Sequence, residues 1–154
     1  MSRAFVKEQD IGAAEGLPER PVSEHPNDVT PEGAARIDAE LAAARTAYAA
    51  AQKFSDRAAL ASAFRDVRYW SSRRATARVI PPPEDHDQVR FGAIVKIARD
   101  DGREQTFRIV GEDEADPSRG SISHVSPLAR AMFGKRVGDV VRAGDGEAEI
   151  RSIS

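Results

Sequence analysis

The feature that most constrains this chain is a run of three prolines, Pro81-Pro82-Pro83. Proline has no backbone N–H and its ring clashes with the preceding turn, so a helix cannot continue through this tripeptide. Before it, residues 31–80 are rich in alanine and arginine and contain one glycine, Gly33. After it, short apolar and β-branched runs are bounded by glycine or aspartate, which is typical of strands. The sequence therefore predicts an α+β fold with a helical half and a sheet half.

Residues 31–80 are expected to form an antiparallel helical hairpin, with helices at 31–53 and 56–79. Thr30 can cap the first helix, and Pro31 suits its first helical position. Apolar residues follow at the alternating spacings of a coiled-coil seam. The first seam consists of Ile37, Leu41, Ala44, Tyr48 and Ala51, and the second of Leu60, Ala63 or Phe64, Val67, Trp70 and Ala77. Two arms of similar length joined by a short turn must pack antiparallel, with Asp56 at the tip.

The rest of the chain divides into three segments. Residues 1–30 contain three prolines and no sustained apolar period, so they are expected to be a flexible N-terminal arm. Residues 81–88 are expected to be a linker. Residues 89–154 carry strand-like runs around a short helix, which Ser126 can cap and Pro127 can begin. This last segment predicts a small β-sheet domain with one short helix.

Composition excludes several classes of function. Lys and Arg number 23 against 25 Asp and Glu, a formal net charge of -2, which argues against a broadly basic nucleic-acid binder. The chain has no cysteine, which removes thiolate nucleophiles and cysteine metal sites, and its three histidines lack metal-ligand spacing. No apolar run is long enough to cross a membrane, and the first residues do not read as a secretory signal. We therefore expect a cytoplasmic protein with no membrane partner.

One long stretch of the C-terminal half is specific enough to suggest a family. It comprises residues 108–116, residues 123–133 and the dipeptide Gly138-Asp139, and it resembles the C-terminal signature of the bacterial Gre transcription elongation factors, GreA and GreB. The resemblance implies a coiled coil that enters the secondary channel of bacterial RNA polymerase. It also implies that residues 89–154 form a domain similar to FK506-binding proteins, which docks on the polymerase. The polymerase-binding residues it implies are Asp113, Glu114, Ser126, Pro127, Leu128 and Phe133.

The tip of the hairpin departs from cleavage-active members of that family. In those members two acidic tip residues help to hold a Mg²⁺ ion in the active site of the polymerase. Here the aspartate position is kept as Asp56, but Ala59 stands at the glutamate position and Leu60 at the asparagine position. Asp56 could support the shared Mg²⁺, or it could simply cap a helix. We expect no active site, cofactor or metal of the chain's own, and weak or absent stimulation of transcript cleavage.

Several alternatives remain open at this level. A similar sequence is expected of a short-armed relative that resembles the regulator of nucleoside diphosphate kinase. It is also expected of an inhibitor that blocks the channel. Prolyl isomerase activity is suggested only by the fold that the resemblance implies. The arginine-rich second helix could face RNA, an acidic channel wall or solvent. We expect a monomer that meets nascent RNA or template only through the transcription complex.

Overall fold

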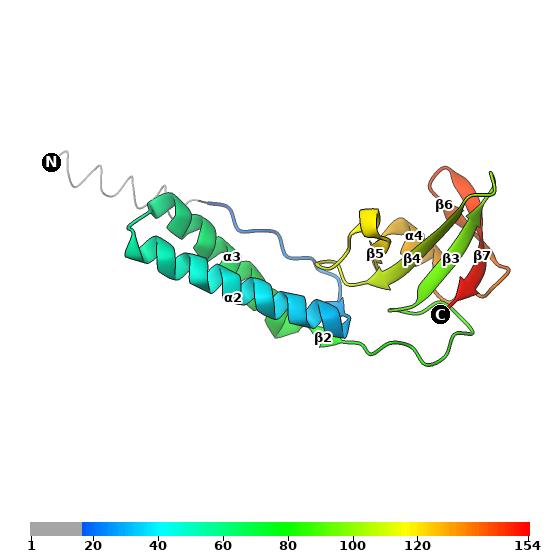
Figure 1. Ribbon diagram of the computed structural model, residues 1–154, viewed down its shortest axis with the longest axis horizontal. Helices are drawn as coiled ribbons and strands as arrows, with labels where there is room; N and C mark the ends of the chain where they lie inside the picture. Colours follow the sequence, from blue (N-terminus) through cyan, green and yellow to red (C-terminus); the bar gives the residue numbers. More distant parts are fainter. Residues whose placement is uncertain (1–16) are drawn as a thin grey trace. The chain divides into compact units, whose positions relative to one another are not determined.

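The computed structural model describes residues 17–154, and the chain divides into two compact units (Figure 1). The helical unit contains residues 17–24 and 35–76, and the sheet unit contains residues 25–34 and 77–154. The boundary therefore falls inside the first long helix, after its first turn. The fold class expected from the sequence, α+β with a helical pair and a small sheet domain, is confirmed.

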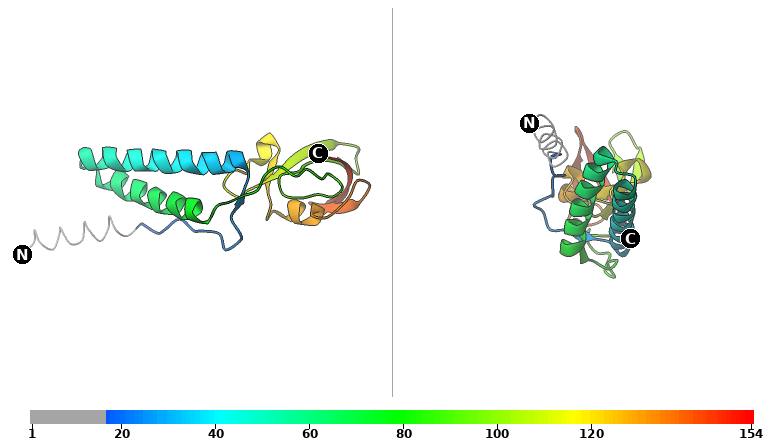
Figure 2. Two further views of the ribbon diagram at one scale, coloured as in Figure 1. Left: turned by 90° about the horizontal axis from the view of Figure 1, so that it is seen from below. Right: turned by 90° about the vertical axis from the view of Figure 1, so that its left-hand side faces the viewer.

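The helical unit is built from α2 (Pro31–Lys53) and α3 (Arg57–Thr76), which lie side by side and antiparallel in both figures (Figure 2). The rings of Tyr48 and Phe64 meet across the pair at 6.0 Å between centroids. The buried seam positions are Ile37, Leu41, Ala44, Ala51, Ala63 and Trp70. Phe64 stays 47% exposed, so Ala63 fills the seam position that the sequence left open between the two.

The second helix is shorter than predicted, because tertiary pairing ends it. Arg78–Val79 forms strand β2, which pairs in parallel with β1 (Asp28–Val29). The backbone N–H of Arg78 donates to the Asn27 carbonyl at 2.9 Å, and its guanidinium Nε lies 2.7 Å from an Asp28 carboxylate oxygen. The helix therefore ends at Thr76, and Ala77 lies outside the seam predicted for it.

The sheet unit holds a curled five-stranded sheet with the order β5-β4-β3-β7-β6 (Figure 1). Its strands are β3 (Ile94–Arg99), β4 (Glu104–Val110), β5 (Ser121–Ser123), β6 (Val140–Ala143) and β7 (Gly146–Ile153). Only β4 and β5 pair in parallel; the other neighbours are antiparallel. A short 3-10 helix, η1 (Pro117–Arg119), precedes β5, and α4 (Pro127–Met132) follows it.

The core of the sheet unit lies between the sheet and α4. Apolar residues alternate along the strands, so every second side chain of β3 and β7 points inward. The buried set is Val89, Ala93, Val95, Ile97, Ile109, Ile122, Ala129, Met132, Val141, Ala143, Ala148 and Ile150. Within residues 17–154, no helix is long and apolar enough to cross a membrane.

The segment boundaries differ from those expected. Residues 1–16 of the predicted arm lie outside the described residues, residues 17–24 pack in the helical unit, and residues 25–34 belong to the sheet unit. Residues 77–88, predicted as the end of the hairpin and a linker, also belong to the sheet unit. The physical reason is the pairing of β1 with β2, a contact between segments 50 residues apart that no local pattern encodes.

The turn between α2 and α3 is a C-terminal helix cap in which Ser55 has a strained backbone conformation. Ser55 has φ 53, in the left-handed region. Its N–H donates to the Gln52 carbonyl at 3.3 Å, and the N–H of Asp56 donates to the Ala51 carbonyl at 3.0 Å. This pair of bonds is the Schellman motif, which normally places glycine at the left-handed position, because a Cβ there crowds the backbone.

Replacing Ser55 by glycine should therefore stabilise the helical unit by about 1 kcal/mol, since the left-handed strain is relieved. The measurement is thermal unfolding followed by helical circular dichroism. Ser55→Ala is the matched control, because alanine keeps the Cβ and should not raise the midpoint. A glycine variant no more stable than the alanine variant would contradict the assignment of strain to this turn.

Candidate functional site

The short helix α4 is held in place by its own first residues. Ser126 caps the helix, and its hydroxyl oxygen accepts a hydrogen bond from the Ala129 N–H at 3.3 Å. Pro127 occupies the first helical position, where its missing N–H leaves nothing unpaired, and it is exposed. Ala129 and Met132 point into the core. The capped helix therefore presents Pro127 to solvent on a rigid support.

The two apolar residues predicted beside Pro127 have different surroundings. Leu128 is half-buried and packs against the core of the sheet unit. Phe133, at the end of α4, is 36% exposed. It lines an open hollow of about 460 Å³ together with Ile80, Pro81, Pro83, Gln88, Val89, Arg90, Phe91 and Gly134. Phe133 is thus available to a partner, whereas Leu128 mainly supports the helix.

Glu114, predicted to bind polymerase, is instead part of an internal hydrogen-bond network. Its carboxylate accepts from the Thr30 N–H at 2.9 Å, from the Thr30 hydroxyl, and from the Gly111 N–H at 3.1 Å. The Thr30 hydroxyl oxygen in turn accepts from the Gly33 N–H at 3.0 Å. The carboxylate therefore ties the first turn of α2 to the acidic turn after β4.

Gly33 and Gly111 make this network possible. A Cβ on Gly33 would lie 2.2 Å from a carboxylate oxygen of Glu114, and one on Gly111 would lie 2.6 Å from the Asp28 carbonyl oxygen. Any larger residue at either position would displace these neighbours. Sequence analysis identified Thr30 as a helix cap but missed its bond to Glu114, because nothing local links residues 84 positions apart.

The remainder of the acidic turn is also structured. Asp113 is half-buried. Asp116 caps η1, where its carboxylate accepts from the Ser118 hydroxyl and from the Ser118 N–H at 3.2 Å. The hydroxyl bond holds the pKa of the Asp116 carboxyl below its usual range, assisted by the Ser118 N–H and the nearby Arg119. Two carboxylates of the acidic run, those of Glu114 and Asp116, therefore stabilise the turn from within.

His124 lies at the start of the signature segment and is partly enclosed. Its ring packs edge-on against Phe91, with 5.5 Å between centroids. Among the described residues its Nε2 has no hydrogen-bond partner. Burial lowers the pKa of His124 below its usual value, although Asp28 and Glu112 act in the opposite direction. Burial therefore favours the neutral form of the imidazole.

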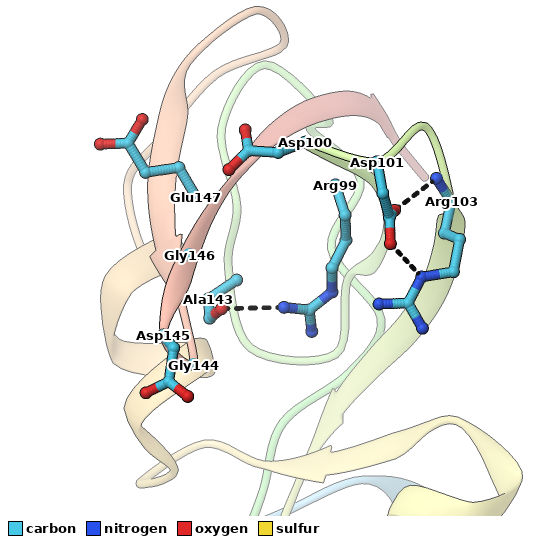
Figure 3. Close-up of a pocket in the computed structure, with 9 residues that line it drawn as sticks. All are labelled: Arg99, Asp100, Asp101, Arg103, Ala143, Gly144, Asp145, Gly146 and Glu147. Atoms are coloured by element: carbon cyan, nitrogen blue, oxygen red, sulfur yellow. Dashed lines mark hydrogen bonds and ion pairs between the residues drawn. The ribbon is translucent and has the colours of Figure 1, made fainter.

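A second hollow, of about 290 Å³, lies between the β3–β4 and β6–β7 turns (Figure 3). Arg99 crosses it, donating to the Ala143 carbonyl at 2.8 Å and to the Gln105 side chain at 2.5 Å. Asp101 pairs with Arg103 at 2.6 Å. Across residues 17–154, no group of three or more His, Cys, Asp or Glu side chains could hold a metal ion. The hollow is therefore a polar turn region without metal-site geometry.

The hairpin tip carries the one acid kept from the predicted motif. Asp56 is exposed, and its carboxylate accepts from the Ala59 N–H at 3.1 Å, so it caps α3. Phe54, at the same turn, is 74% exposed. Leu60, at the asparagine position of the family motif, is half-buried. The tip thus offers a single carboxylate, already engaged with the helix N-terminus.

Comparison with known proteins identifies the sheet unit. Residues 84–153 match the family model described as transcription elongation factor, GreA/GreB, C-term. The match lies within the sheet unit, and the two long helices lie outside it. Transcription elongation factor GreB of Neisseria meningitidis serogroup B is 46% identical over 94 residues, which cover 58% of each chain. GreA of Hyphomonas neptunium is 60% identical over 53 residues, or 34% of each chain.

Among solved structures, GreA factor homolog 1 of Thermus thermophilus is similar at 19% identity and a TM-score of 0.41, covering 84% of this chain and 99% of that one. The chain spans 58% of the length of the first curated relative it matches. The matched family domain contains all the predicted polymerase-binding residues, from Asp113 to Phe133, but not Asp56.

The network around Glu114 predicts a clear effect on stability. Glu114→Gln places an amide N–H₂ against N–H and O–H donors, so at least one hydrogen bond is lost in a partly buried site. The free energy of unfolding of the sheet unit should fall by about 1–3 kcal/mol. The measurement is urea unfolding of the full chain.

The matched control for this prediction is Glu104→Gln. Glu104 is exposed on β4, and its only recorded ion pair among the described residues is with Lys96 at 3.5 Å, on the surface. That change should cost no more than about 0.5 kcal/mol. Equal unfolding midpoints for the two variants would show that the Glu114 network does not stabilise this Gre-family domain.

Proposed function

We propose that this chain binds bacterial RNA polymerase and acts as a Gre-type transcription elongation factor. The observation that carries this proposal is the match of residues 84–153 to the GreA/GreB C-terminal domain. The curated relatives bear the names of transcription elongation factors, and their similarity to this chain is concentrated over about half its length. Because the relatives share this domain, the proposal assigns this chain the same kind of partner, RNA polymerase.

In this proposal, the sheet unit docks on the polymerase through exposed residues at the two ends of α4. Pro127 and Phe133 supply the apolar contact, and the half-buried Asp113 lies in the neighbouring acidic turn. Ser126, Leu128 and Glu114 act indirectly, because their side chains cap the helix, pack on the core and hold the turn. An exposed apolar group on a rigid support loses little conformational entropy on binding, which favours affinity.

The helical unit would act through the secondary channel of the polymerase, with weak or absent stimulation of transcript cleavage. Mg²⁺ requires several oxygen ligands, and Asp56 offers one carboxylate that already caps α3. The chain would therefore be a non-catalytic cofactor of the polymerase. Any Mg²⁺ would be the polymerase's own, nascent RNA would be met only within the complex, and the chain would act as a monomer.

The same tip favours one alternative, an inhibitor that works by occupying the channel. With alanine at position 59, the hairpin lacks the second carboxylate of cleavage-active family members. A factor that docks normally but cannot support cleavage would compete with cleavage-active relatives. An inhibitor of this kind is recognised by its effect on cleavage-active relatives, because it should lower the transcript cleavage that they stimulate.

The docking proposal is tested with Pro127→Glu. Glutamate is well tolerated at the first helical position, so the fold should persist while an apolar contact is replaced by a charge. Affinity for core RNA polymerase should fall about tenfold or more. Val79→Glu, a matched change at a residue 52% exposed on β2, should leave affinity within about twofold. Undiminished binding by folded Pro127→Glu would remove α4 from the docking surface.

The cleavage proposal is tested with backtracked transcription complexes. Excess chain should suppress the transcript cleavage that a cleavage-active Gre factor stimulates. Asp56→Asn should leave this competition unchanged, since asparagine caps a helix as well as aspartate. Ala59→Glu should restore weak cleavage at most. Strong Mg²⁺-dependent cleavage by the unmodified chain that disappears in Asp56→Asn would overturn the proposal and make Asp56 a functional ligand.

A further inference from the structure

Residues 17–24 run alongside α3 without forming a helix or strand (Figure 1). Two adjacent residues make the contacts. The guanidinium carbon of Arg20 lies 3.9 Å from the centroid of the Tyr69 ring, and its Nη1 lies 3.0 Å from a carboxylate oxygen of Asp66. A carboxylate oxygen of Glu19 lies 3.1 Å from Nε of Arg68. Two charges of the segment therefore each face an opposite charge on α3.

These contacts hold the segment only weakly. The Glu19 and Arg68 side chains are 59% and 56% exposed, so water and salt screen their attraction. Leu17 and Val22 remain 41% and 44% exposed, so little apolar surface is buried. Ordering an extended segment costs conformational entropy at every residue. The docked form of residues 17–24 therefore depends on the partly exposed ion pairs of Glu19 and Arg20, which salt weakens.

The surface beneath the segment is basic and partly aromatic. Helix α3 carries five arginines and one acidic residue, Asp66. Arg65, Arg68 and Tyr69 lie three or four positions apart and share one face of the helix. Among the described residues, the enclosed Nε of Arg65 has no hydrogen-bond partner. A hollow of about 410 Å³ lies beside these contacts, and its α3 lining is Arg68, Tyr69 and Ser72.

We propose that residues 17–24 are a releasable strap over a docking face of α3, and that this face receives an acidic surface of RNA polymerase. The strap itself indicates the chemistry, because Glu19 already places a carboxylate on Arg68. A partner carboxylate would replace Glu19 there. This inference rests on the proposed function, since it names a second contact with the same partner.

The first measurement detects the strap without polymerase. Trp70 is the only tryptophan of the chain, and it lies 5.4 Å from the Arg20 guanidinium and edge-on to Tyr69. In the double variant Glu19→Gln/Arg20→Gln, acrylamide should quench Trp70 more strongly than in the unmodified chain. Raising salt from about 0.05 to about 0.5 M should increase quenching in the unmodified chain and leave the variant unchanged.

The second measurement is affinity for core RNA polymerase. The double variant should bind about threefold more tightly, the gain expected if the strap is docked in two thirds of the free molecules. Adding Arg68→Ala should remove that gain. Glu24→Gln, which changes an exposed charge in the same segment, should alter neither quenching nor affinity. Helical circular dichroism should be the same for all variants, because none of these side chains fills the α2–α3 seam.

The outcomes separate the strap from the proposed function. Unchanged Trp70 quenching overturns the strap. Increased quenching with unchanged or weaker polymerase binding overturns the docking face but leaves the proposed function intact. A gain in affinity for a single-stranded RNA oligonucleotide, with none for polymerase, also overturns it, since the face would then bind phosphate. Absence of any polymerase binding by the unmodified chain overturns the proposed function and this inference together.

Discussion

The position of residues 25–34 in the sheet unit depends on the hydrogen bonds that the Glu114 carboxylate accepts. It receives the Thr30 N–H, the Thr30 hydroxyl and the Gly111 N–H. A partly buried carboxylate is stable only when such donors surround it. The bonds join the start of α2 to the turn after β4, and the pairing of β1 with β2 closes the same region. Residues 25–34, which include the first turn of α2, therefore belong to the sheet unit.

The residues predicted to bind polymerase fall into two groups, those with internal partners and those with exposed apolar surface. Glu114, Ser126 and Leu128 have internal partners, so their chemistry is used in holding the loop and α4. Pro127 and Phe133 retain exposed apolar surface. A rigid helix with an exposed proline at its start and an exposed aromatic side chain at its end is suited to binding a protein partner. At the hairpin tip, the Asp56 carboxylate likewise has an internal partner, because it accepts a hydrogen bond from the Ala59 N–H and caps α3.

Sequence reasoning was most successful where structure depends on local chemistry. The start of α2 followed from Thr30 and Pro31, and the cap of α4 followed from Ser126 and Pro127, because capping involves residues two or three positions apart. The seam positions Ile37, Leu41 and Ala44 followed from helical spacing. The predicted end of α3 was wrong, because the pairing of Arg78 with Asp28 overrides a helical pattern that could otherwise have continued.

What the sequence alone determined is the α+β class, the helical hairpin, the capped short helix and the absence of a second tip carboxylate. Each of these depends on residue identity and on spacings of a few positions. Only the tertiary structure decided that Glu114 faces inward, that Gly33 and Gly111 must lack side chains, and that Arg20 lies on Tyr69. These contacts join residues about 50 or more positions apart, and the energy that selects them exists only once both partners have folded.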